Sequence, residues 1–274
     1  MTKPKLIAID IDGTLIDSKT EIHPKVVETI RKVTADGAQV ALATGRMVSA
    51  CEKYLRQLNI KLPTIALNGS FVGWPNARRK PIYSETISRE SSHKIIEAAW
   101  NCNITLILVD CDRAFVRNIT ELTGPALETW IVNISPLKDI LDIDGTKPSL
   151  ILIAGDGGDV TALQQRTNSF GITDIAHYLF PSIRYFPMHY LEIRARNVDK
   201  GKGLTMLAEY LGIRNEEILA IGDYINDIPM SGVAGTFAAP ANARENVRAV
   251  ADYVSPLTNN DGAVAEILEK LYFV

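Results

Sequence analysis

Short apolar runs of strand length, set between helical patterns, restrict the folds open to this chain of 274 residues more than any other feature. A run without alternating polar residues is typical of a strand buried on both faces, as in a parallel sheet covered by helices. Three such runs lie near the start of the chain and two in its last third: KLIAID, AQVALAT, TIALN, ILAIGD and TFAAP. The sequence therefore predicts an α/β fold with a doubly wound, mostly parallel, Rossmann-like sheet.

The pattern changes between residues 84 and 189, where α+β elements replace the buried runs. Near the end of this segment, IRYFP and YLEIRA are expected to pair as two strands. Because the segment interrupts the first sheet, we predict an inserted domain over residues 84–189. The first domain would then consist of residues 1–83 and 190–274.

The composition is that of a globular protein that binds neither nucleic acid nor membranes. Apolar residues make up 46% of the chain and charged residues 22%, unlike the low hydrophobicity of disordered segments. The formal net charge of −3 gives no basis for attraction to nucleic acid or to an anionic membrane. Three cysteines without CxxC spacing argue against a zinc site and a disulfide framework, and no apolar window approaches the length of a membrane span. We therefore expect a cytoplasmic protein.

The pentapeptide DIDGT occurs twice, at residues 10–14 and at residues 142–146. The first copy follows LIAI directly, so its aspartates are expected at the carboxyl end of a buried parallel strand, where open α/β sheets bind their ligands. The second copy precedes Lys147-Pro148 and indicates a turn, in which Asp142 and Asp144 would bond to nearby backbone groups. We predict that only the first copy takes part in chemistry.

Polar residues also follow two other predicted strands. Thr44-Gly45 comes directly after AQVALA, and Asp223 opens a polar segment that follows ILAIG. Because the carboxyl ends of parallel strands meet at one edge of a sheet, these residues are expected to assemble with Asp10 and Asp12. The sequence therefore predicts one site built from distant segments.

In chain order, these segments resemble the four motifs of the haloacid dehalogenase superfamily. The matching residues are Asp10–Thr14, Thr44-Gly45, Lys200-Gly201 and Gly222–Asp227. Leu67-Asn68-Gly69, and the insertion placed between the second and third motifs, resemble more narrowly the Cof-type subgroup of sugar-phosphate phosphatases with a large α/β cap. The resemblance covers essentially the whole chain, and it implies that the inserted domain is a cap that selects the substrate.

The resemblance also implies a Mg²⁺-dependent phosphohydrolase that cleaves small phosphate monoesters, above all sugar phosphates. Asp10 would be the nucleophile that forms an aspartyl-phosphate, and Asp12 the general acid and base. The cation would cancel the repulsion between the carboxylate and the phosphate dianion. Mg²⁺ would be bound by the carboxylates of Asp10 and Asp223 and the backbone carbonyl of Asp12, and the phosphoryl group by Thr44, Gly45, Lys200 and Asn226, with Asp227 and Asn68 in support.

Other functions are open on the sequence alone. A phosphomutase of the same superfamily would carry the same motifs, and a non-catalytic protein would use such a site to bind phosphate and metal. A dehalogenase is disfavoured, because a halide leaving group needs neither the second aspartate at position 12 nor a cation. The expected partner is a small phosphorylated metabolite, with flavin mononucleotide and pyridoxal phosphate as alternatives to a sugar phosphate. A monomer and a homodimer are both open.

Overall fold

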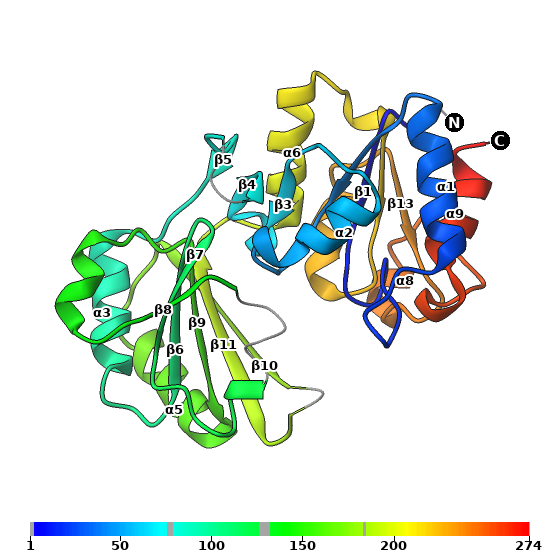
Figure 1. Ribbon diagram of the computed structural model, residues 1–274. Helices are drawn as coiled ribbons and strands as arrows, with labels where there is room; N and C mark the ends of the chain where they lie inside the picture. Colours follow the sequence, from blue (N-terminus) through cyan, green and yellow to red (C-terminus); the bar gives the residue numbers. More distant parts are fainter. Residues whose placement is uncertain (1–2, 76–78, 126–131, 183–184, 274) are drawn as a thin grey trace. The chain divides into compact units, whose positions relative to one another are not determined.

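The chain divides into two units in the computed structural model, which describes residues 3–75, 79–125, 132–182 and 185–273 (Figure 1). The first unit consists of Met1–Tyr83 and Asp199–Val274, and the second of Ser84–Val198. The predicted return to the first domain at residue 190 falls inside strand β11 (Met188–Ala195), which pairs with a neighbour on each side. Because these hydrogen bonds hold β11 in the second unit, the boundary lies at Asp199 instead.

The apolar runs of the first unit form a five-stranded sheet in which all neighbouring strands are parallel, and the predicted fold class is confirmed. Across the sheet the order is β14 (Tyr253–Val254), β13 (Thr236–Ala239), β12 (Ile218–Ile221), β1 (Leu6–Ile9) and β2 (Gln39–Leu42). Ile9 pairs with Ile221 on one side and with Leu42 on the other, so these three strands end at the same level. The strand order reverses at β1, and such a switch point is where open α/β sheets bind ligands.

Helices cover both faces of this sheet, because successive side chains of each strand point to opposite faces. Ile7 and Ile9 share a core with three helices, α1 (Pro24–Ala35), α2 (Glu52–Gln57) and α9 (Ala263–Leu271). Leu6 and Ala8 share a second core with three others, α6 (Lys200–Leu211), α7 (Ile228–Ser231) and α8 (Glu245–Arg248). Within the described residues, no helix combines the length and the apolar character needed to cross a membrane.

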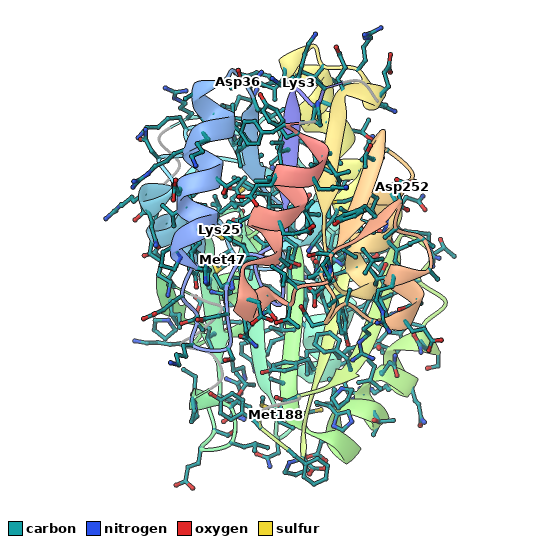
Figure 2. The ribbon with its side chains drawn as sticks, turned by 90° about the vertical axis from the view of Figure 1, so that its right-hand side faces the viewer. Lys3, Lys25, Asp36, Met47, Met188 and Asp252 are labelled. Carbon is teal, nitrogen blue, oxygen red and sulfur yellow. The ribbon has the colours of Figure 1, made fainter. Side chains whose placement is uncertain are left out.

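Ion pairs lie at both ends of α1 but are not what holds this helix. Lys3 pairs with Asp36, which directly follows the helix, and Lys25 in its first turn pairs with Glu269 of α9 at 2.8 Å. Figure 2 shows Lys3 and Asp36 together near one end of α1 and Lys25 further along it. All four side chains are about half exposed, so these pairs contribute little to stability. The apolar face of α1 therefore supplies most of its attachment.

A small three-stranded sheet, in which the first two strands are antiparallel, extends the edge of the first unit beyond β2. It contains β3 (Thr64–Ala66), β4 (Phe71–Gly73) and β5 (Tyr83–Ser84), in that order. A single parallel bridge between Ala43 and Ile65 joins β3 to the end of β2. The chain leaves β3 through Leu67 and Asn68, both with positive φ, and so delivers Asn68 to the same edge as the ends of β1 and β2.

The second unit is a six-stranded, mostly antiparallel sheet with two helices packed on one face. Its order is β10 (Ile175–Pro181), β11, β9 (Leu150–Asp156), β6 (Thr105–Asp110), β7 (Arg113–Arg117) and β8 (Ile134–Pro136), covered by α3 (Arg89–Ala99) and α5 (Gly157–Asn168). The strand predicted over IRYFP is wrong, because residues 175–181 form the partner of β11. Of IRYFP, Ile183 and Arg184 lie outside the described residues, and Tyr185–Pro187 form a turn.

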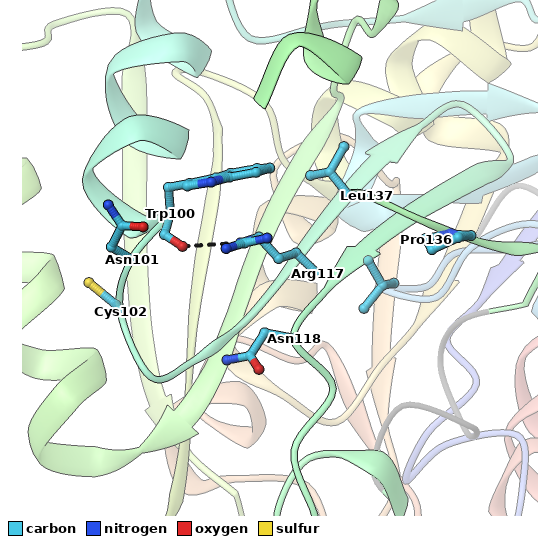
Figure 3. Close-up of a pocket in the computed structure, with 8 residues that line it drawn as sticks. Trp100, Asn101, Cys102, Arg117, Asn118, Pro136 and Leu137 are labelled. Atoms are coloured by element: carbon cyan, nitrogen blue, oxygen red, sulfur yellow. Dashed lines mark hydrogen bonds between the residues drawn. The ribbon is translucent and has the colours of Figure 1, made fainter. Parts of the chain in front are cut away.

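A pocket of about 460 Å³ lies in the second unit, beside the end of α3 (Figure 3). The guanidinium of Arg117 stacks on the indole of Trp100 at 4.0 Å from the ring centroid, and its Nε donates to the Trp100 carbonyl at 3.1 Å. No carboxylate is among the residues that line it: Trp100, Asn101, Cys102, Val116, Arg117, Asn118, Pro136 and Leu137. This pocket is therefore separate from the acidic residues predicted to act in chemistry.

Candidate active site

Three aspartates from two neighbouring strand ends meet at the switch point of the first unit. Asp10 follows β1, while Asp223 and Asp227 follow β12. One carboxylate oxygen from each lies within 4.8 Å of the others. Two carboxylates predicted to share one cation, Asp10 and Asp223, are therefore close enough to do so. They are brought together because β1 and β12 pair in parallel and end at the same level.

Lys200 is buried between two of these acids. Its Nζ lies 2.6 Å from Oδ1 of Asp10 and 2.5 Å from Oδ1 of Asp227, and only 1% of its surface is exposed. Lys200 is the first residue of α6, and the glycine after it lets this helix lie against the segment that follows β12. A Cβ on Gly201 would lie 2.4 Å from the carbonyl oxygen of Pro229. In the predicted Lys200-Gly201 motif, Lys200 thus supplies the positive charge, and Gly201 allows α6 to approach closely enough to place that charge between the acids.

The acids crowd one another electrostatically. Burial raises the pKa of Asp10 well above its ordinary value, and the charge of Asp227 adds to this effect, while Lys200 opposes it. Burial and Asp227 also raise the pKa of Asp223. For Lys200, burial alone would lower the pKa, but the two carboxylates outweigh it and raise the pKa. The site therefore carries more negative charge than its lysine balances.

Asp227 accepts more hydrogen bonds than the other two members of the acidic cluster. Its Oδ2 accepts the backbone N–H groups of Asp223 and Tyr224, both at 2.9 Å, and its Oδ1 accepts from Lys200. By contrast, Asp223 accepts through Oδ1 from the hydroxyl of Thr14 at 3.0 Å. Asp227 thus contacts both Lys200 and the turn after β12, and its supporting role in the site stays a prediction.

The donor set fits a divalent cation. With every carboxyl group ionised, the four charges of Asp10, Asp12, Asp223 and Asp227 face two cations, Lys200 and Arg46, which leaves a formal excess of two negative charges. Carboxylate oxygens are hard ligands of the kind that Mg²⁺ binds. An ion of charge two would balance the site.

Three of the four residues predicted to bind phosphate, Thr44, Gly45 and Asn226, form a second group at the same edge. The amide Nδ2 of Asn226 donates to Oδ1 of Asn68 at 2.8 Å, and the backbone N–H of Asn68 donates to the Thr44 carbonyl at 3.0 Å. A Cβ on Gly45 would lie 3.2 Å from the Asn68 amide, so this glycine also touches the group. Asn68 therefore joins the loop after β2 to the loop after β12 and holds Thr44, Gly45 and Asn226 together.

The structure adds one residue that sequence reasoning missed. Arg46 forms a two-pronged ion pair with Asp12, with Nε 2.7 Å from Oδ2 and Nη2 2.5 Å from Oδ1. Its position directly after Thr44-Gly45 could have indicated a place in the site, because this loop begins where a buried strand ends at the ligand-binding edge. An arginine is usually exposed, and sequence alone gave it no partner.

The second DIDGT lies in the other unit, and its two aspartates make different contacts: Asp142 bonds to nearby backbone as predicted, whereas Asp144 pairs with a side chain. Oδ2 of Asp142 accepts the backbone N–H of Asp139 at 2.9 Å and so caps the short helical turn Ile140–Gly145. Asp144 pairs with the guanidinium of Arg89 at 2.8 Å. Neither aspartate belongs to the acidic cluster found among the described residues.

Comparisons with known proteins agree with this geometry. Residues 7–268 match the sequence profile of the family described as haloacid dehalogenase-like hydrolase. The chain is 27% identical to the 5-amino-6-(5-phospho-D-ribitylamino)uracil phosphatase of Bacillus subtilis, over 99% of this chain and 98% of that protein. It is 29% identical to a phosphoglycolate phosphatase of Methanopyrus kandleri, over 97% and 96%. A haloacid dehalogenase-like hydrolase from Bacteroides thetaiotaomicron superimposes with a TM-score of 0.82 at 27% identity, over 98% and 99%. The chain belongs to the haloacid dehalogenase-like hydrolase family.

Proposed function

We propose that this hydrolase cleaves small phosphate monoesters, sugar phosphates in particular, through a phosphoryl group carried transiently by Asp10. The observation that carries the proposal is the buried contact of Lys200 with Asp10, 2.6 Å long, beside Asp223 at the switch point of the sheet. With Oδ1 on the lysine, the Asp10 carboxylate can attack phosphorus through its other oxygen. The relatives named above are phosphatases, which supports the same reaction class.

In the first step, a carboxylate oxygen of Asp10 attacks phosphorus and the ester oxygen leaves. Lys200 favours the charged form of Asp10, and its ammonium also stabilises charge that develops on the phosphoryl oxygens. Thr44, Gly45 and Asn226 supply further hydrogen bonds to those oxygens. The product is an aspartyl-phosphate, a mixed anhydride.

Two proton transfers complete the cycle, and we assign both to Asp12. The departing ester oxygen takes a proton from the Asp12 carboxyl group in the first step. In the second step, the Asp12 carboxylate takes a proton from the water that attacks phosphorus, so that inorganic phosphate leaves and Asp10 is regenerated. The carboxylate of Asp12 is suited to this role because 48% of its side chain is exposed.

Asp10 and Asp223, with the backbone carbonyl of Asp12, would hold Mg²⁺, which when bound neutralises charge between the phosphate dianion and the nucleophile. The second unit, Ser84–Val198, would act as the cap that selects the leaving group. Sugar phosphates, flavin mononucleotide and pyridoxal phosphate, offered singly at equal concentration, would identify the substrate class. We place the activity in the cytoplasm, in line with three cysteines that form no disulfide bond with one another.

Adding Mg²⁺ to protein stripped with chelator is expected to raise the melting temperature. Two uncompensated charges at the site are relieved only in the folded state, so binding stabilises that state by about 2.7 kcal/mol at a concentration of 100 Kd. For a chain of this size this corresponds to a shift of about 5 °C. Differential scanning fluorimetry would measure it. The variant Asp223→Asn should lose the shift, whereas Asp144→Asn in the second DIDGT should keep it; an unchanged shift in Asp223→Asn would rule out this ligand set.

Alanine at Gly13 is expected to lower kcat/KM by about 100-fold, the effect of displacing a reacting group by roughly 1 Å. Gly13 has φ +81°, and a Cβ there would lie 2.4 Å from Oδ2 of Asp223, so the carboxylate must move. The matching glycine of the second DIDGT, Gly145, has no atom within 4 Å of an added Cβ. Gly145→Ala is therefore the control, and assays with p-nitrophenyl phosphate should show it unimpaired. Equal activities of the two variants would contradict the geometry.

A further inference from the structure

The ion pair between Arg46 and Asp12 has an unusual distribution of burial. Arg46 is only 5% exposed, whereas the side chain of Asp12 is 48% exposed. The guanidinium is therefore the fixed part of the pair, and the carboxylate is the part that faces outward. Both contacts are short, at 2.7 and 2.5 Å, and they join parallel edges of two planar groups.

Several contacts hold Arg46 in place independently of Asp12. Its backbone N–H donates to the hydroxyl of Thr44 at 3.1 Å, and its carbonyl accepts the N–H of Leu67 at 3.1 Å. Its guanidinium also lies over the ring of Tyr54, 5.8 Å from the centroid. These contacts fix the backbone of Arg46 and place an aromatic ring beside its guanidinium, in addition to the ion pair with Asp12.

We propose that Arg46 is the positioning residue of Asp12, and that its planar fork sets the direction in which Asp12 gives and takes its proton. The inference rests on the proposed function. Each Asp12 oxygen accepts one N–H from the fork and keeps a second lone pair that points away from the guanidinium. The proton passed to the ester oxygen, and later taken from water, occupies such an outer position. Without the guanidinium, the Asp12 carboxyl group can rotate, and its proton no longer points at the ester oxygen.

The test compares two substrates that differ in their need for a proton. An alkyl phosphate must have its leaving oxygen protonated as the P–O bond breaks, whereas p-nitrophenolate leaves without a proton. The variant is Arg46→Met, which keeps an apolar stem to pack in the same place. We expect the ratio of kcat/KM for the alkyl phosphate over p-nitrophenyl phosphate to fall by about 100-fold. With p-nitrophenyl phosphate, a burst of one equivalent of p-nitrophenol should appear, because the water step also slows.

Two further variants separate orientation from charge. Arg46→Lys keeps the positive charge without the fork, so the ratio should stay low. In an Asp12→Asn background, adding Arg46→Met should change the ratio by less than about twofold, because the group being positioned is already gone. Equal losses on both substrates would mean that Arg46 binds the phosphoryl group, and full recovery with lysine would mean that only its charge matters. Either result overturns the proposal.

Failure of the underlying function gives a different result. If Asp12→Asn by itself leaves the ratio of the two substrates unchanged, Asp12 is not the acid, and the proposed function fails together with this inference. If Asp12→Asn lowers the ratio and Arg46→Met does not, only the role of Arg46 fails. Retention of the Mg²⁺-dependent melting shift in Arg46→Met would show that the acidic cluster is intact in the variant tested.

Discussion

Asp10→Asn is expected to lower kcat for p-nitrophenyl phosphate by at least about 10³-fold. Asparagine has nearly the same shape, but its amide is a poor nucleophile and forms no mixed anhydride. Losses of this size or larger follow removal of the nucleophile in enzymes that form a covalent intermediate, and the remaining rate reflects binding and electrostatics. Initial rates in the presence of Mg²⁺ would measure the effect. A variant that retains a tenth of the wild-type rate would refute Asp10 as the nucleophile.

The same variant should fold at least as well as the wild type. Burial and the neighbouring Asp227 disfavour the charged form of Asp10, so a neutral side chain relieves repulsion, while Lys200 keeps its contact with Asp227. Loss of activity with an unchanged or higher melting temperature would separate chemistry from folding. The matched control is Asp142→Asn, the first aspartate of the second DIDGT, which caps a turn and should retain full activity.

Lys200→Met is expected to lower the free energy of unfolding by about 3–5 kcal/mol, the range found when one partner of a buried ion pair is removed. Methionine fills much of the lysine volume, so the loss reflects charge more than packing. Asp10 and Asp227 would be left buried without their cation. Urea denaturation in the presence of chelator would measure the change, and kcat should fall as well, because the nucleophile loses the group that keeps it ionised.

Lys202→Met is the control for this prediction. Lys202 lies two residues further along α6, where its ammonium group is 5.8 Å from the centroid of the Tyr83 ring. Among the described residues it makes no ion pair with Asp10, Asp223 or Asp227. Its replacement should change stability by less than about 0.5 kcal/mol. If Lys200→Met and Lys202→Met were equally stable, the contacts of Lys200 with Asp10 and Asp227 would have no energetic weight.

The fold and most of the site were predictable because both depend on strand ends. Unbroken apolar runs identify strands of a covered parallel sheet, and polar residues directly after them must lie along one edge. This reasoning brought Asp10 and Asp223 to the same place although 212 residues separate them in the numbering. It also distinguished the two DIDGT copies, since only one follows a buried run.

The features that sequence analysis missed depend on which residues contact one another in the folded chain, and the order of residue types along the sequence does not specify those contacts. IRYFP and the observed strand β10 (IAHYLFP) are both rich in residues that favour strands. What distinguishes them is pairing with β11, which β10 achieves from Ile175 opposite Ala195 to Pro181 opposite His189. Likewise, the position of Arg46 was visible in the sequence, but its buried fork on Asp12 was not. The different hydrogen bonds of Asp223 and Asp227 are also visible only in the structure: Asp223 accepts from a hydroxyl group, and Asp227 accepts from two backbone N–H groups.

The start of α6 coincides with the return of the chain to the first unit, and this has a consequence for how Lys200 is held. Lys200 stands one residue after the point where the chain returns from the second unit, and a Cβ on Gly69 would lie 1.9 Å from the carbonyl oxygen of Asp199 at that point. The loop after β3 and the junction are thus locked together by backbone contact, with no side chain between them. Because Asp10 and Asp227 also belong to the first unit, the ammonium group of Lys200 is anchored entirely by residues outside the inserted segment.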